Sequence, residues 1–338
     1  MTTLKDVARH VLYGSGLLGL AHRVRNRRTL TVLMFHRVLP TNSEAYRHAE
    51  REFTFSENGF GRCLDFLRQH YNVVTLADLA AAKNGLKALP DRAALITFDD
   101  GWRDTLQYAQ PALLQRRLPA LLFVAAEVPT LQCDRWWQDA LVSVLADCQA
   151  TAKLLSRLAP HQQGGAALPD NAHQIHAILA AMPEAARMAL LQEVAPMPCL
   201  PRQMLTADEL AQLQHDATIA LGAHGFSHVP LTALSQTQSA HELTVSMRWL
   251  QSTHAHPLSM SFPHGAYNDG LARAAYGAGF HWLFTSHPFL TPTIQGSQRV
   301  TTLGRIHVPE NQWTCTNGQL SFAKLAMFLF FRSKEMVQ

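Results

Sequence analysis

The sequence lacks any C-x-x-C pair, has few charged residues and contains no basic run interleaved with aromatics. Five scattered cysteines, an odd number, argue against a disulfide framework and fit a reducing compartment. Charged residues make up 16% of the 338 residues and hydrophobic residues 47%, so the chain can bury a large core and is not a disordered protein. Without a basic and aromatic pattern, and with a net charge of only +4, nucleic acid is not expected as a partner.

Short apolar segments lie near both ends, at 11–20 and 322–334. The first is followed by the basic stretch HRVRNRR where a signal peptide would have an A-x-A-like site, and it is too short to span a bilayer. Each segment could be a helix packed on the domain. Apolar segments with basic flanks also suit a helix lying in an anionic membrane surface. We therefore expect a cytoplasmic chain, with peripheral contact to an anionic membrane as the alternative to simple packing.

Between these ends, apolar runs that predict strands alternate with stretches that predict helices. The expected strands lie at 30–38, 93–100, 119–126, 217–224, 256–263, 279–286 and 305–308, and the stretch 72–82 is expected to form a short strand and a helix. A helix is expected at 56–71 with Ser56 as its N-cap, and another at 103–117, broken near Pro111. This alternation predicts a parallel α/β sheet or barrel.

The stretch from about 136 to 214 differs, because it is rich in Ala and Leu and shows no convincing strand. We interpret it as a helical insertion into the α/β domain. The expected organisation is an N-terminal apolar and basic helix over 1–28, the main domain over 29–310, and an apolar and basic tail over 311–338.

Two adjacent carboxylates, Asp99 and Asp100, follow the apolar run LITF and precede Gly101. Neighbouring residues of a strand point to opposite faces, so the pair cannot share one core. One interpretation is a strand that ends there, with one aspartate capping the next helix. The other is a strand end at which one carboxylate binds a metal and its neighbour handles a proton.

Histidine is abundant, and His224 and His228 stand four residues apart directly after the apolar run TIAL. On a helix this spacing places two imidazoles on one face, close enough to chelate one ion. The pair also follows an expected strand, and the carboxyl ends of barrel strands share one face. One carboxylate and two imidazoles are a suitable ligand set for a catalytic divalent metal.

The sequence T-F-D-D-G at 97–101, followed by H-x-x-x-H at 224–228, resembles the metal-dependent polysaccharide deacetylases, carbohydrate esterase family four. The resemblance runs from about Leu30 to Pro309 and implies an irregular (β/α) barrel of that type. Carried over by position, it implies that Asp99 is the general base. It also implies that Asp100, His224 and His228 bind a divalent metal, by default zinc, with manganese, cobalt or nickel as alternatives.

The family's third motif is replaced by SFPHG at 261–265. The residue after the proline offers its backbone N–H to the oxyanion in relatives, and this role passes to His264; a turn residue at the rim is the simpler alternative. The arginine that orients the base in relatives is missing before Pro263. Trp282 is a weak match to the motif that lines the acetyl pocket in the family. The simpler interpretation is that Trp282 is a residue of the hydrophobic core. Trp102 and Tyr267 could stack on sugars or serve as packing residues.

The general acid of the family is a histidine in an L-x-H motif, which does not follow the fourth motif in this chain. LMFH at 33–36 resembles the circularly permuted order of some members and favours His36 as the acid. The competitor is His307, which we expect to lie within a strand without access to the site face.

These residues predict a hydrolase that removes N-acetyl groups from an amino-sugar polymer or a lipid-linked glycan. The same chemistry permits an O-acetyl esterase. A non-catalytic glycan-binding module and a membrane-associated scaffold are the alternatives from other classes.

Overall fold

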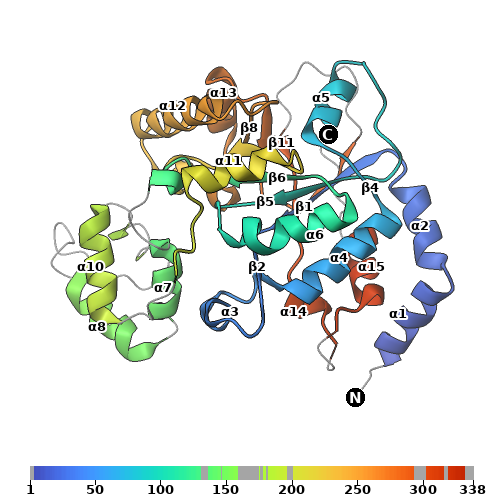
Figure 1. Cartoon of the computed structure of the whole chain (residues 1–338), viewed down its shortest axis with the longest axis horizontal. Coiled ribbons are helices and arrows are strands. Elements are labelled where there is room, and N and C mark those ends of the chain that lie inside the picture. Colours follow the sequence, from blue (N-terminus) through green and yellow to red (C-terminus); the bar gives the residue numbers. More distant parts are fainter. Residues whose placement is uncertain are drawn as a thin grey trace. The chain divides into compact units, whose positions relative to one another are not determined.

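The computed structural model describes residues 4–130, 136–145, 147–158, 175, 178–179, 182–195, 201–292, 302–315 and 319–331 (Figure 1). Two compact units make up the chain. The first comprises Met1–Thr41, Arg51–Thr130 and Leu205–Gln338, and the second comprises Asn42–Glu50 and Leu131–Met204.

A ten-stranded sheet forms the centre of the first unit. Its strands are β1 (Thr29–Phe35), β4 (Asn72–Val73), β5 (Ala93–Phe98), β6 (Ala120–Val124), β7 (Ile219–Ala223), β8 (Ser259–Ser261), β9 (Trp282–Phe284), β10 (Thr291–Pro292), β11 (Thr302–Leu303) and β12 (Ile306–His307). Their order is β10-β1-β5-β6-β7-β8-β9-β11, with β4 beside β5 and β12 beside β1. β10 runs antiparallel to β1, and the other pairings described for this sheet are parallel. β2 (Arg37–Leu39) and β3 (Thr54–Ser56) form a separate parallel pair.

The two ends of the large sheet are joined by one short segment of chain. β11 pairs with β9, and β12 pairs with β1, while only Gly304 and Arg305 separate β11 from β12. The sheet therefore curls into a nearly closed barrel of mainly parallel strands. This confirms the irregular (β/α) barrel predicted from the alternation of strands and helices.

Helices connect several of the barrel strands, and others precede β1 or follow β12. Those of the first unit are α1 (Leu4–Gly14), α2 (Leu17–Arg25), α4 (Glu57–His70), α5 (Leu76–Lys83), α6 (Gln110–Arg116), α11 (Ala207–His215), α12 (Gln236–Ser252), α13 (Asp269–Gly277), α14 (Glu310–Trp313) and α15 (Phe322–Phe331). Ser56 is the N-cap of α4, as predicted. Its Oγ accepts the Gly59 N–H at 2.9 Å. A π-helical turn, η1 (Thr105–Ala109), precedes α6, so the winding changes just before Pro111, which has no N–H to donate.

Alternate residues of the barrel strands share one apolar core. Leu30 pairs with Ala93 and Val32 with Leu95 across β1 and β5, and all four belong to a cluster that side chains of β6, β9, β11 and α5 complete. The cluster includes Trp282, which is 3% exposed, so this residue is core, as the simpler interpretation held. Two residues further along these strands, Met34 pairs with Thr97. Because side chains alternate, His36 and Asp99 follow on the same side.

The second unit is helical in its described residues. Its helices are α3 (Glu44–His48), α7 (Trp137–Leu145), α8 (Cys148–Leu158) and α10 (Glu184–Val194). α7, α8 and α10 share a core of their own that includes Leu141, Leu154 and Leu191. α11 belongs to the first unit, and the second unit ends at Met204. The Pro- and Gly-containing stretch at 159–170 lies outside the described residues.

The C-terminal apolar segment forms α15, which packs against both α1 and α2. Five of its ten side chains are buried: Ala323, Leu325, Ala326, Leu329 and Phe330. This segment is therefore a helix packed on the domain, which is the first of the two interpretations given for it. Among the residues that the structure describes, no helix is long and apolar enough to cross a membrane.

Candidate metal and catalytic site

The polar residues singled out in the sequence meet at the carboxyl ends of the barrel strands. Asp99 and Asp100 follow β5, and His224 follows β7. Parallel strands end at the same edge of a sheet, which brings these separate segments together. Asp100 has φ +79° and Gly101 has φ +92°, so the chain turns sharply immediately after the strand. This turn directs Asp99 and Asp100 to different neighbours.

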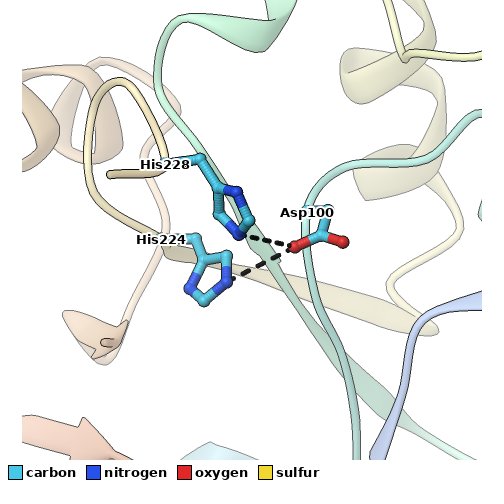
Figure 2. A group of neighbouring side chains, drawn as sticks. All are labelled: Asp100, His224 and His228. Carbon is cyan, nitrogen blue, oxygen red and sulfur yellow. Dashed lines mark ion pairs between the residues drawn. The ribbon is translucent and has the colours of Figure 1, made fainter. Parts of the chain in front are cut away.

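Asp100, His224 and His228 form a compact group of metal-ligand atoms (Figure 2). Asp100 Oδ1 lies 3.1 Å from His228 Nε2 and 3.4 Å from His224 Nε2. One ligand atom from each residue lies within 4.8 Å of the others. The geometry therefore brings together all three residues that the sequence predicted as metal ligands.

Neighbouring groups orient this trio for a cation. His224 Nδ1 lies 2.9 Å from the Ser261 carbonyl oxygen, which can only accept, so Nδ1 carries the proton and Nε2 presents its lone pair. Trp102 Nε1 donates to Asp100 Oδ2 at 2.9 Å, which leaves Oδ1 toward the imidazoles. A histidine fixed by a carbonyl, and a carboxylate fixed by a donor, are typical of metal ligands. The donor set fits a divalent ion such as zinc.

Charge pairing within the trio shifts its proton affinities. Burial alone would raise the pKa of Asp100, but His228 and His224 outweigh it and hold that pKa well below its usual range. Burial alone would lower the pKa of His224, but Asp99 and Asp100 outweigh it and raise that pKa. A cation bound at Nε2 of His224 would compete with this proton.

The segment that carries the two histidines is a loop rather than the helix predicted from their spacing. Gly225 has φ +74° and His228 has φ +59°, which breaks helical winding. Glu242 of α12 holds the loop instead. Its carboxylate accepts the N–H groups of Phe226 at 2.7 Å and Ser227 at 3.1 Å, and the Ser227 hydroxyl at 2.6 Å. Glu242 could not be predicted from the sequence, because no local pattern connects it to the histidines.

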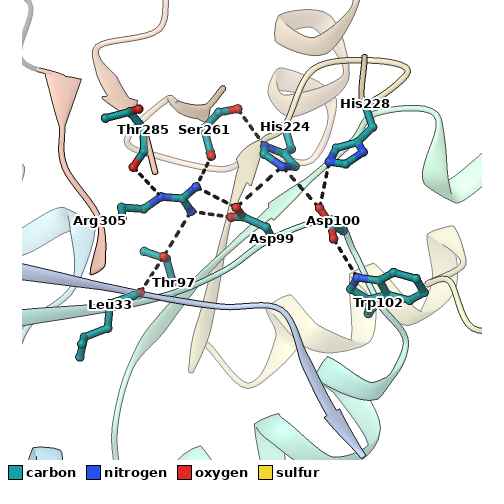
Figure 3. A network of polar contacts seen from close by, with 10 residues as sticks. All are labelled: Leu33, Thr97, Asp99, Asp100, Trp102, His224, His228, Ser261, Thr285 and Arg305. Carbon is teal, nitrogen blue, oxygen red and sulfur yellow. Dashed lines mark hydrogen bonds and ion pairs between the residues drawn. The ribbon is translucent and has the colours of Figure 1, made fainter. Parts of the chain in front are cut away.

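Asp99 is buried and held by Arg305 through two hydrogen bonds (Figure 3). Arg305 Nη1 donates to Oδ1 at 2.6 Å, and Nη2 donates to Oδ2 at 2.7 Å. Burial raises the pKa of Asp99, yet the charges of Arg305 and His224 outweigh it and lower that pKa overall. His224 Nε2 lies 3.8 Å from Asp99 Oδ2, so the base candidate borders the trio.

Arg305 supplies the arginine that the sequence analysis found missing before Pro263. It sits between β11 and β12, and only 1% of its surface is exposed. Its other contacts are Ser261 Oγ at 2.8 Å, the Thr285 carbonyl at 3.2 Å and Thr97 Oγ1 at 3.4 Å (Figure 3). The available signal was an arginine in the last expected strand, within GRIH.

His36 and His307 lie together at the edge of the site. Their ring centroids are 5.9 Å apart, and both rings contact Phe53. Burial lowers the pKa of His36, while the negative charges of Asp100 and Asp99 act to raise it. His307 pairs in register with Met34, so its place in a strand does not keep it from this face. The expectation that His307 lacks access to the site face is therefore wrong.

His264 lies beside the trio in the turn that follows β8. Its ring is 4.7 Å from that of His228, and its side chain is exposed. With φ +56° it adopts a left-handed conformation that non-glycine residues rarely take. The next two backbone N–H groups, of Gly265 and Ala266, donate to the carbonyls of Phe262 and Pro263. His264 is thus an exposed turn residue beside His228.

Trp102 is buried and does not offer a free sugar-stacking surface, in contrast to one of its two interpretations. The Arg37 guanidinium lies 4.0 Å from its ring centroid, and Arg37 is itself paired with Asp104 at 2.9 Å. Its indole N–H is engaged by Asp100. Tyr267 is half-buried and stacks on Phe262, with centroids 5.3 Å apart.

A family model described as polysaccharide deacetylase matches residues 169–283. This range contains His224, His228 and Pro263, whereas T-F-D-D-G at 97–101 lies before it. A comparison with curated proteins finds no match.

Several solved deacetylase structures share the fold of this chain. The deacetylase PplD of Streptococcus pyogenes, in complex with acetate, is 14% identical with a TM-score of 0.56, covering 90% of this chain and 99% of its own. IcaB of Ammonifex degensii is 18% identical with a TM-score of 0.56, covering 90% and 97%. A de-N-acetylase of Aggregatibacter actinomycetemcomitans is 17% identical with a TM-score of 0.55, covering 82% and 94%. The polysaccharide deacetylase model thus covers the part of the chain that carries the histidine motif, and the barrel with its strand-end residues shares the fold of these solved deacetylases.

Proposed function

We propose that the protein is a metal-dependent hydrolase that removes N-acetyl groups from an amino-sugar polysaccharide or a lipid-linked glycan. The observation that carries this proposal is the buried Asp99–Arg305 pair directly beside the Asp100–His224–His228 trio. Two adjacent aspartates thus have separate environments, which suits separate roles. Among the similar structures, one is a de-N-acetylase and another was solved with acetate, which supports amide hydrolysis at such a site.

The trio would hold the divalent cation, with zinc as the first choice. When bound there, a divalent cation supplies Lewis acidity toward the acetamide carbonyl and the attacking water. His224 and His228 contribute Nε2 and Asp100 contributes Oδ1.

The proton transfers fall to residues outside the trio. Asp99, kept ionised by Arg305, accepts a proton from the attacking water. His36 donates a proton to the leaving nitrogen as the C–N bond breaks, so that acetate and a free amine result. The backbone N–H of His264 would donate to the oxyanion, beside the rim of the site. Arg305 acts on the reaction through Asp99, as a positioning residue.

Acetate release tests the proposal. The purified chain is assayed on matched N-acetylated and O-acetylated oligosaccharides, after chelation and after return of zinc, manganese, cobalt or nickel. We expect release from the N-acetyl substrates, loss on chelation and recovery with at least one metal. Release from O-acetyl substrates alone would identify an esterase, and a metal-loaded chain that binds glycan without releasing acetate would be a binding module.

Asp99→Asn keeps the size of the side chain but removes the proton acceptor. Turnover should fall by roughly 10²–10⁴-fold, with metal content unchanged. Asp269→Asn, a change at an exposed carboxylate on α13, is the matched control and should leave both unchanged. Loss of metal from the Asp99 variant would place this carboxylate among the ligands.

We also propose a cytoplasmic location. Cys63, Cys148 and Cys315 are free thiols, while Cys133 and Cys199 lie outside the described residues. Free thiols fit a reducing compartment. Cell fractionation against cytoplasmic and periplasmic markers tests this location.

A further inference from the structure

Exposed apolar side chains are concentrated on α1 and α2. Among the described residues, ten large apolar side chains are exposed, and six of them lie on this helix pair: Val7, Val11, Leu12, Leu17, Leu20 and Val24. Val24 is 73% exposed, Val11 63% and Leu20 60%. A seventh, Phe331, ends α15 and lies 5.9 Å from the Arg25 guanidinium. An apolar cluster of this kind on one surface marks an interaction site.

The folded domain uses only the inner side of this helix pair. On α2, Leu18 and His22 are buried, and the His22 ring stacks on Phe330 at 4.0 Å. On α1, the Tyr13 hydroxyl lies 3.0 Å from His70 Nε2. α15 contacts both helices. The inner side of the helix pair therefore packs against the rest of the domain. The exposed apolar side chains on the outer side do not take part in this packing.

The outer residues form a regular stripe. Leu17, Leu20 and Val24 recur at intervals of three and four residues along α2, and Val7 and Val11 do so along α1. Residues at these intervals share one face of a helix. We call Val7, Val11, Leu17, Leu20 and Val24 the outer face. Figure 1 shows the two helices following each other along one side of the first unit.

The net positive charge of the protein comes from the same segment. Residues 1–28 contain six basic residues and one acidic residue, which leaves 23 basic and 24 acidic residues in the remainder. Arg23, Arg25, Arg27 and Arg28 are exposed. The excess of positive charge thus lies next to the outer face, while the rest of the chain is close to neutral.

We propose that the outer face docks on an anionic lipid bilayer, with its apolar side chains in the interfacial region and the neighbouring arginines at the lipid phosphates. Apolar area and basic charge on one helical surface are the two components of reversible membrane binding. A second copy of the chain fits this surface less well, because it would bring two segments of strong positive charge together. α15 contributes only Phe331 to the exposed large apolar side chains, and five of its other side chains are buried.

Vesicle flotation of the full chain tests the inference. The probes are phosphatidylcholine vesicles with and without phosphatidylglycerol, at low and at high salt. We expect binding to the anionic vesicles at low salt and release as salt rises. Equal binding to neutral vesicles at both salt concentrations would overturn the role of charge.

Two paired variants separate the components. Leu20→Ser with Val24→Ser should weaken partitioning by roughly tenfold or more, because two apolar side chains are lost from the interface. Arg23→Gln with Arg28→Gln should weaken binding to anionic vesicles by roughly tenfold. The matched controls are Leu86→Ser, at an aliphatic residue that is 78% exposed outside the helix pair, and Arg68→Gln on α4. Both controls should bind like the wild type.

Acetate release from a soluble oligosaccharide and metal content should stay unchanged in all four variants, so failure of the membrane inference is distinguishable from failure of the proposed function. Wild-type binding by the Leu20/Val24 variant would overturn the inference. Sedimentation velocity completes the test. A wild-type dimer that the same variant converts to monomer would identify the outer face as a self-association surface instead.

Discussion

Arg305 donates to both carboxylate oxygens of Asp99, at 2.6 and 2.7 Å, across 206 positions of sequence. A bidentate pair fixes the orientation of the carboxylate as well as its charge. Asp99 is therefore held ionised and in one orientation within a buried site.

Arg305→Gln should move the acidic limb of the activity profile to higher pH. Arg305 and His224 lower the pKa of Asp99 against burial, so loss of the arginine charge leaves burial less opposed and raises that pKa. The ionised base then disappears at a higher pH as the solution is acidified. A profile of kcat against pH, with metal content measured in parallel, checks this. Ser261→Ala removes one contact of Nη2 but no charge, and should shift the limb far less.

His228→Ala should lower metal content and turnover together, since it removes one of three proposed ligands. His264→Ala is the matched control, because its ring lies 4.7 Å from His228 but does not belong to the ligand group. Metal analysis by mass spectrometry, with acetate release on the same samples, makes the comparison. Unchanged metal stoichiometry in the His228 variant would remove this residue from the ligand set.

Glu242→Gln should weaken metal affinity by roughly 10–100-fold without unfolding the barrel. The carboxylate accepts three donors from Phe226 and Ser227, and an amide in its place has only one oxygen to accept them. Competition with a chelator measures the affinity. His241→Ala, at the exposed neighbour on α12, should leave affinity unchanged. Equal affinities would show that the loop holds its shape without this residue.

His36→Ala should cut turnover strongly while leaving metal content intact. Burial lowers the pKa of His36, so the protonated donor is lost as pH rises, and the alkaline limb of the profile should flatten when the residue is removed. His307→Ala is the decisive comparison, because the two rings are 5.9 Å apart. If His307→Ala flattened the limb and His36→Ala did not, the acid would be His307.

Acidification should loosen α1 and α2 before the barrel. Burial, with the nearby charge of Arg92, lowers the pKa of His22 to about 3, whereas the unfolded residue titrates near 6.5. The packed helices hold the neutral ring, so their stability is complete above about pH 6.5 and declines as pH falls toward 3. Hydrogen exchange of 4–25 measures the loosening. His22→Phe should reduce it, and His10→Gln, at an exposed position, should not.

The positions of the strand-end residues could be predicted, because the ends of the strands determine where these side chains lie. Asp99, Asp100 and His224 directly follow apolar runs, and in a parallel barrel such positions meet. The four-residue spacing of His224 and His228 correctly brought the two imidazoles together. It wrongly suggested that the segment between them is a helix. Positive φ angles at Gly225 and His228 make a loop, and the contacts of Glu242 stabilise it.

Arg305 and Glu242 could not be predicted, because their roles depend on tertiary contacts. Arg305 lies 206 positions from Asp99, and its place in the last expected strand did not reveal that partner. Glu242 lies 15 positions from Ser227, within a helix whose sequence does not point to the histidine loop. Trp102 was likewise ambiguous. An aromatic beside two carboxylates could face sugar or protein, and only the packing of Arg37 on its ring decides between them.

The two-residue link between β11 and β12 also determines when a growing chain acquires the last of the residues proposed for catalysis. A polypeptide whose synthesis has passed β9 already contains Asp99, Asp100, His224 and His228. It still lacks Arg305, and it lacks β12, which closes the sheet against β1. Synthesis must therefore reach Arg305 before Asp99 receives its countercharge, so a product terminated before that residue would retain Asp100, His224 and His228 without an oriented Asp99.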